Sequence, residues 1–150
     1  MSESTTDEPV DILLVEDNPG DVRLTQLAFS ESEMDTRIHV VVDGDEVLDV
    51  LHERADSDSA PFPDLVLLDL NLPRVGGLEV LERIRDVPEF AHLPVLILTS
   101  SRANEDVVSS YERSANAYLT KPTDPNEFAT LAKAVENFWF RRAQLPPISP

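Results

Sequence analysis

Five side chains that could carry out chemistry follow short apolar runs of the sequence, directly or after a short gap. They are two acids after the first run, an acid after the third, a threonine after the fourth and a lysine after the fifth: Glu16, Asp17, Asp69, Thr99 and Lys121. Carboxylate oxygens are the ligands that Mg²⁺ prefers in proteins. An ammonium group and a hydroxyl are suitable donors to phosphoryl oxygens. A carboxylate nucleophile beside a metal and such donors would be equipped for phosphoryl transfer to an aspartate.

Three acids in one pocket require a compensating positive charge. Two unit charges about 4 Å apart repel by roughly 4 kcal/mol at an effective dielectric of 20. Either a cation must offset that repulsion or the pKa of one acid must rise. Lys121 is one of only two lysines in the chain, which favours a functional role over a role in solubility. Taken alone, Asp69 is also typical of a solvated loop or a helix cap, and Thr99 of an ordinary strand end.

The apolar runs alternate with segments of helical spacing, and this alternation predicts the fold. The runs are Val10–Val15, Ile38–Val42, Leu65–Leu68, Val95–Leu98 and the weaker Ala117–Leu119. Between them, apolar residues share helical faces at 24, 27 and 28, at 47, 48 and 51, at 78, 81 and 84, and at 107, 108, 111 and 115. Strict alternation predicts an α/β fold: a doubly wound, flavodoxin-like parallel sheet of five strands in the order 2-1-3-4-5, with helices on both faces. Such sheets bind ligands at the carboxyl ends of their strands, where the five side chains stand.

A final helix is indicated after the fifth run. Asp124 is the expected N-cap and Pro125 the first helical residue. The apolar stripe of this helix comprises Phe128, Leu131, Ala132, Val135, Phe138 and Trp139. We expect a single domain over residues 1–150, with a core at about 10–142 and flexible tails at 1–9 and 145–150.

The composition excludes several classes of function. Of 150 residues, 12 are basic and 29 acidic, so the formal net charge is −17. Such a surface repels phosphate backbones and anionic lipid, which argues against direct binding of nucleic acid or membrane. The chain has no cysteine, no apolar run long enough to span a membrane and no signal peptide, so we expect a soluble, cytoplasmic protein. An acid-rich, lysine-poor surface is similar to that of proteins from salt-loving organisms.

Four segments resemble the receiver domain of two-component response regulators. They read ILLVEDNPGDVRL, DLVLLDLNLPRVGGLEVLERIR, PVLILTSS and ANAYLTKP, and together they span nearly the whole chain. The resemblance implies that Asp69 accepts a phosphoryl group from a histidine of a sensor kinase in a phosphorelay. It implies Mg²⁺, for which Mn²⁺ can substitute, bound by Asp17, Asp69 and the backbone carbonyl of Asn71, with Glu16 acting largely through water. Thr99 and Lys121 would bind the phosphoryl oxygens.

The same resemblance implies a switch and a cis peptide. Tyr118 takes the position of the aromatic residue that turns inward as Thr99 moves, although a half-buried edge tyrosine is an equally ordinary interpretation. The Lys121–Pro122 peptide is expected to be cis.

A narrower resemblance, carried by EDNPGDVRLTQ and NFWFRRAQLPP, is to regulators paired with phytochrome-type sensor kinases. That group often associates through its last helix, where Phe138, Trp139 and Phe140 form a candidate dimer patch. Burial of these three side chains in the core of the monomer is the equal alternative.

With about 120 residues taken by the receiver fold, we expect a phosphorylation-activated switch without an output domain, acting on an unidentified protein target. It would be an enzyme only toward its own phosphorylation and dephosphorylation. One alternative is a receiver-like binding module without phosphoryl chemistry. A second is a Mg²⁺-dependent phosphatase acting through an aspartyl phosphate, which usually has an acid where this chain has Asn71. A nucleotide-binding dehydrogenase is excluded because no Gly-x-Gly-x-x-Gly follows the first run.

Overall fold

The computed structural model describes residues 9–33, 35–58, 60–100, 103–122 and 124–143. Strands and helices alternate along the chain as the sequence predicts. The elements are β1 (Val10–Val15), α1 (Pro19–Ser30), β2 (Thr36–Val41), α2 (Val47–Ala55), β3 (Leu65–Leu68), α3 (Gly77–Asp86), β4 (Val95–Thr99), α4 (Asn104–Glu112), β5 (Ala117–Thr120) and α5 (Pro125–Ala143). Two short 3₁₀ helices, η2 (Gly44–Glu46) and η3 (Pro88–Phe90), were not predicted from the sequence.

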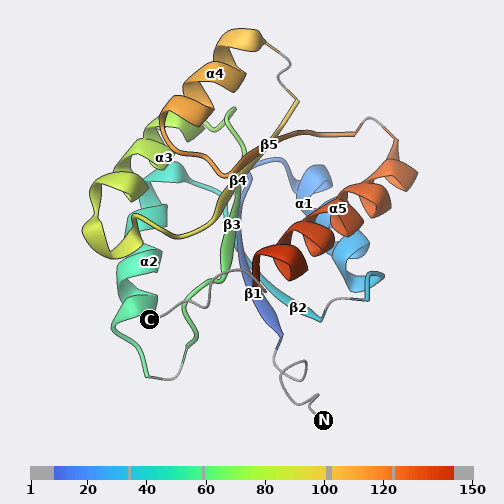
Figure 1. Ribbon diagram of the computed structural model, residues 1–150, viewed down its shortest axis with the longest axis horizontal. Coiled ribbons are helices and arrows are strands. Elements are labelled where there is room, and N and C mark those ends of the chain that lie inside the picture. The colour runs from blue at the N-terminus through green and yellow to red at the C-terminus, as the bar shows by residue number, and fades with distance from the viewer. Residues whose placement is uncertain (1–8, 34, 59, 101–102, 123, 144–150) are drawn as a thin grey trace.

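The five strands form one parallel sheet in the order β2-β1-β3-β4-β5, which confirms the predicted fold class. Helices α2, α3 and α4 cover one face of the sheet, and α1 and α5 cover the other (Figure 1). The central strands β1, β3 and β4 are almost entirely buried, whereas the edge strands β2 and β5 are half-exposed. Burial on both faces explains why the central strands are almost wholly apolar, with Asp11 in β1 and Thr99 at the end of β4 as the polar exceptions.

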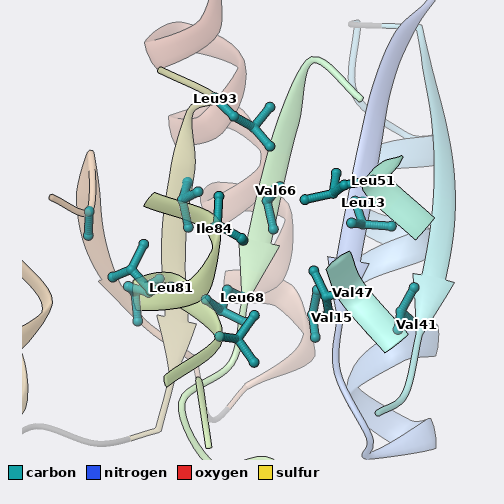
Figure 2. Close-up of a cluster of buried hydrophobic side chains, with 14 of the residues drawn as sticks. Leu13, Val15, Val41, Val47, Leu51, Val66, Leu68, Leu81, Ile84 and Leu93 are labelled. Atoms are coloured by element: carbon teal, nitrogen blue, oxygen red, sulfur yellow. The ribbon is translucent and has the colours of Figure 1, made fainter. Parts of the chain in front are cut away.

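Alternate strand residues feed two separate apolar clusters, one on each face of the sheet. Figure 2 shows the cluster beneath α2 and α3, in which Leu13, Val66 and Leu68 meet Leu51 and Ile84. The second cluster lies beneath α1 and α5 and is built from Ile12, Leu14, Leu65, Leu67, Leu96, Leu98, Phe29, Phe128, Ala132 and Val135. Because both faces are anchored in this way, the carboxyl ends of the strands are held in a fixed register.

Two helix faces differ from those predicted. In α1 the buried residues are Thr25, Ala28 and Phe29, while Leu27 is 46% exposed because the helix is rotated toward Phe29. In α4 the single buried residue is Ser110, and Val108 and Tyr111 are exposed. Two residues of the expected apolar face, Val108 and Tyr111, therefore point away from the sheet, whereas Ala115, just beyond α4, is buried as part of the core.

The ends of α5 and α1 follow the capping rules. The Asp124 carboxylate accepts a hydrogen bond from the Asn126 N–H at 2.9 Å, and α5 begins at Pro125 as predicted. Asn18 caps α1 by accepting the Asp21 N–H at 3.1 Å. Within the described ranges, the structure contains no helix that is long and apolar enough to cross a membrane.

At the amino ends of the strands, one arginine side chain hydrogen-bonds to several backbone carbonyls. Arg85, in the last turn of α3, donates to the carbonyl oxygens of Phe90, Ala91, Leu93 and Ser114 at 2.7–3.3 Å. Its Nη2 also donates to Oδ1 of Asn116, which accepts the Val95 N–H at 2.8 Å. Burial without a carboxylate partner lowers the pKa of Arg85. This network fixes the start of β4 and the loop between α4 and β5.

Candidate functional site

Backbone hydrogen bonds carry the sheet ladder past the strand ends and position the functional residues. The Asp69 N–H donates to the Val15 carbonyl at 3.1 Å, and the Lys121 N–H to the Thr99 carbonyl at 2.7 Å. Gly77, at the start of α3, allows that helix to approach the segment after β3, because an added Cβ would lie 2.2 Å from the Asp69 carbonyl oxygen. The predicted residues therefore meet in one pocket at the carboxyl edge of the sheet.

Three carboxylates form the acidic side of this pocket. Glu16, Asp17 and Asp69 each offer an oxygen, and these oxygens all lie within 4.8 Å of one another. Glu16 and Asp69 are buried, whereas Asp17 is exposed and opens the cluster to solvent. A set of hard oxygen donors with one open side fits Mg²⁺ or Mn²⁺, which retain several water ligands in protein sites. The observed grouping is the same set of acids that the sequence predicts.

Lys121 reaches three carboxylates from the end of β5. Its Nζ lies 2.6 Å from Glu16, 2.8 Å from Asp21 and 2.9 Å from Asp69. Sequence reasoning missed Asp21, which lies on α1, 100 residues from its partner. Its only local signal is the Asn18 cap three residues earlier. The ammonium group supplies compensating positive charge to the two buried acids of the cluster, Glu16 and Asp69.

Burial and charge act in opposite directions on the pKa values of the pocket. Burial, together with the charge of Asp69, outweighs Lys121 and raises the pKa of Glu16 to about 7. Burial also acts to raise the pKa of Asp69, but hydrogen bonds from the Asn71 N–H and Lys121 outweigh it and leave that pKa below its usual value. Burial opposes the charge of Lys121, yet hydrogen bonds with Asp21, Glu16 and Asp69 raise its pKa. The resulting state has Asp69 as a carboxylate and Lys121 as an ammonium.

Asn71 joins the phosphoacceptor candidate to Thr99. Its backbone N–H donates to Asp69 Oδ1 at 3.0 Å, and its side-chain Nδ2 lies 3.2 Å from the hydroxyl of the fully buried Thr99. Metal ligation by the Asn71 carbonyl stays a prediction. Tyr118 is partly buried against the cluster beneath α2 and α3, and its backbone N–H donates to the Tyr111 hydroxyl at 3.2 Å.

At the site itself, the predicted cis peptide is wrong. The Lys121–Pro122 peptide is trans, as are the other peptide bonds of the described residues. The trans form is the more stable isomer of an Xaa–Pro bond by about 0.5–1 kcal/mol, and Lys121 reaches its partners without the cis form. The side chains of the candidate dimer patch, Phe138, Trp139 and Phe140, lie outside the described residues, so that patch stays a prediction.

The geometry can be compared with known proteins. The sequence model of the family described as "Response regulator receiver domain" matches residues 12–133. Response regulator Rcp1 of Synechocystis sp. is 38% identical over 138 residues, which are 92% of this chain and 94% of that protein.

Two solved structures have the same fold over nearly their full length. The phosphorylated cyanobacterial phytochrome response regulator RcpA is 37% identical, with a TM-score of 0.82 over 93% of this chain and 99% of its own. The Mn²⁺-bound form of Rcp1 is 38% identical, with a TM-score of 0.79 over 92% and 99%. Both of these similar proteins are response regulators, one crystallised phosphorylated and one with a divalent cation.

Proposed function

This chain belongs to the response regulator receiver domain family, and from that premise we propose that Asp69 is the residue that receives the phosphoryl group. The protein is a phosphorylation-activated switch of two-component signalling, and membership of this family implies a histidine kinase as partner. One observation carries the assignment of Asp69. It is the buried carboxylate that belongs to the acidic cluster and also contacts both Lys121 and the Asn71 N–H.

The proposed transfer requires no general base on this chain. A carboxylate oxygen of Asp69 attacks the phosphorus of a phosphohistidine, the O–P bond forms, and the P–N bond breaks. The electron pair of that bond stays on the imidazole nitrogen, which takes up a proton. Lys121 donates to the phosphoryl oxygens in place of the Asp69 carboxylate, and Thr99 offers its hydroxyl to another. Bound Mg²⁺ or Mn²⁺ supplies positive charge to the transferring oxygens.

Hydrolysis returns the chain to its starting state. Water attacks the phosphorus of the acyl phosphate, and inorganic phosphate leaves as the Asp69 carboxylate is restored. Both steps act on the chain itself, so we propose that the protein is not an enzyme toward other substrates.

Relay of the signal is proposed to run through Thr99 and Tyr118. In the resting chain the Thr99 hydroxyl contacts the Asn71 amide at 3.2 Å. When the Thr99 hydroxyl turns to a phosphoryl oxygen, its contact with the Asn71 amide would be lost. This movement would open space beside β4, into which the half-buried Tyr118 turns. The surface of α4 and β5 would then change shape for a protein partner. Association of two copies through α5 is a further part of the proposal, as are the absence of direct nucleic-acid binding and a cytoplasmic location.

Acetyl phosphate tests the assignment. The wild-type chain, incubated with acetyl phosphate and MgCl₂, should gain the mass of one phosphoryl group, and Asp69→Asn should gain none. Asp86→Asn is the matched control, because it makes the same change at an exposed aspartate at the end of α3.

Each of the other possible results would support a different interpretation. Uptake by Asp69→Asn would place the acceptor elsewhere. No uptake by the wild-type chain from acetyl phosphate or a phosphorylated kinase would favour the phosphorylation-independent binding module. Sustained turnover of an external phosphoester would favour the phosphatase.

A further inference from the structure

Asp21 is fixed at the edge of the pocket by both of its backbone polar groups. Its N–H donates to the Asn18 side chain at 3.1 Å, and its carbonyl accepts from the hydroxyl of Thr25 at 2.7 Å. Thr25 is buried, so this turn of α1 is anchored. The first turn of a helix also favours a carboxylate through the helix dipole. The Asp21 side chain, 27% exposed, is thereby held against the Lys121 ammonium.

The three partners of Lys121 are not equivalent. Glu16 and Asp69 belong to the cluster that could share a cation, and Asp21 does not. In the proposed reaction Asp69 becomes an acyl phosphate, and Glu16 would help to hold the metal. Asp21 is therefore the partner that Lys121 can keep throughout.

We propose that Asp21 is a positioning residue for Lys121, which holds the ammonium group at the side of the pocket so that Glu16 and Asp69 can receive the metal and the phosphoryl group. This inference rests on the proposed function. Asp21 contacts neither the reacting oxygens nor the cation cluster in the described structure. Its effect on the reaction passes through the ammonium group.

If Asp21 positions Lys121, the ammonium group and Mg²⁺ should compete measurably for the pocket. Lys121 and Mg²⁺ are attracted to the same oxygens of Glu16 and Asp69. An ammonium group shared among three carboxylates binds each of them less tightly than one shared between two. Loss of the Asp21 charge moves the ammonium toward the remaining pair, so Mg²⁺ must displace a stronger competitor.

Calorimetric titration of the unphosphorylated full chain with MgCl₂ at constant ionic strength measures this competition. The heat seen with Asp69→Asn is subtracted to remove binding to the acidic surface. Asp21→Asn, which keeps an acceptor oxygen but loses the charge, is expected to raise the Mg²⁺ Kd about three- to tenfold, the size of one ordinary hydrogen bond. Glu31→Gln, which removes an exposed carboxylate just beyond the other end of α1, should leave the Kd within about twofold.

A second background separates positioning from direct attraction between Asp21 and the metal. In Lys121→Met the same Asp21→Asn change should alter the Kd by less than about twofold, because the group through which it acts is gone. Asp21→Glu in the wild-type background should restore most of the lost affinity. If Lys121→Met does not fold, as judged by circular dichroism, Lys121→Gln serves as the background for the same comparison.

Phosphorylation kinetics supply an independent readout. In Asp21→Asn the Mg²⁺ concentration that gives half the maximal rate with acetyl phosphate should rise, and the rate at saturating Mg²⁺ should change less. A wild-type Kd in Asp21→Asn, or an equal loss in both Lys121 backgrounds, would overturn the inference and leave the proposed function intact. A wild-type chain that binds Mg²⁺ but takes up no phosphoryl group would overturn the proposed function instead.

Discussion

The two ends of the sheet surround a positively charged side chain with different kinds of partner. At the carboxyl end, the ammonium of Lys121 is shared among three carboxylates that come from β1, α1 and β3. At the amino end, the guanidinium of Arg85 contacts no carboxylate among the described residues and donates mainly to backbone carbonyls. Carboxylate contacts raise the pKa of Lys121, whereas burial lowers that of Arg85.

This difference distinguishes a site whose side chains can change partners from a site whose contacts are fixed by the backbone. Side chains from several elements can give up one partner for another, since their rotamers move independently. Backbone carbonyls that are fixed by η3, β4 and the loop after α4 cannot. The comparison predicts that substitutions at the amino end change folding stability alone, and that substitutions at the carboxyl end change stability in a way that depends on pH or metal.

The largest expected effect is at Arg85. Arg85→Met keeps much of the stem but leaves four backbone carbonyls, those of Phe90, Ala91, Leu93 and Ser114, without this donor, so the free energy of unfolding should fall by about 3–4 kcal/mol. Urea denaturation measures the loss, and the Mg²⁺ Kd should not change. Arg83→Met on the same helix removes exposed pairs with Glu79 and Asp45 and should cost less than about 1 kcal/mol. Equal losses for the two variants would remove the contrast between the ends of the sheet.

The next effect has the opposite sign and depends on pH. The pKa of Glu16 rises from 4.5 to about 7 on folding, so the folded chain retains a proton that the unfolded chain loses between those values. The stability of the metal-free protein should therefore fall by about 3 kcal/mol as the pH rises through that window. Glu16→Gln should remove this fall and be the more stable protein at pH 8, as measured by urea denaturation in EDTA.

A second acid of the pocket acts outside that window. The pKa of Asp69 is lowered by folding, so its contribution to stability is present above its unfolded value and is lost as the pH falls below about 4. The two acids can thus be separated in a single pH series. A wild-type protein whose stability rises between pH 5 and pH 8 relative to Glu16→Gln would contradict the assignment.

The smallest effect concerns the contact between Asn71 and Thr99. A double-mutant cycle with Asn71→Ala and Thr99→Val in the metal-free protein should give a coupling energy of about 1 kcal/mol, the size of one neutral hydrogen bond. In the phosphorylated protein the coupling should vanish, because the threonine hydroxyl has turned to the phosphoryl group. A coupling that persists unchanged after phosphorylation would argue against the proposed movement of Thr99.

Of the central strands, β1 and β3 could be predicted to the residue and β4 to within one residue, whereas the start of the edge strand β2 could not. β1 and β3 begin and end as predicted because each is an apolar run, interrupted in β1 only by Asp11, and is followed by an acid. β2 begins two residues earlier than predicted, at Thr36, since an edge strand with one exposed face admits polar residues such as Arg37. The ion pair of Arg37 with Asp11 depends on the register between β2 and β1, which no local pattern predicts.

The site divides in the same way. Residues placed by strand ends, such as Asp69 and Lys121, could be predicted because the sheet topology brings strand ends together. Asp21 could not, since its role depends on how α1 lies relative to β5, which is set by packing around Phe29 and Phe128. The direction of Leu27 and of the α4 face failed for the same reason, because spacing alone does not give the rotation of a helix. The geometry of the Lys121–Pro122 bond likewise has no signal that its residue types supply.

The order of the strands along the chain has a consequence for synthesis. Glu16, Asp17 and Asp69 leave the ribosome well before Lys121, which directly follows the last strand of the chain. A nascent chain therefore holds its acids without their ammonium counterpart until β5 docks. Only a polypeptide that has finished assembling its sheet offers a kinase a complete acceptor, so partly made copies do not compete with finished ones for the signal.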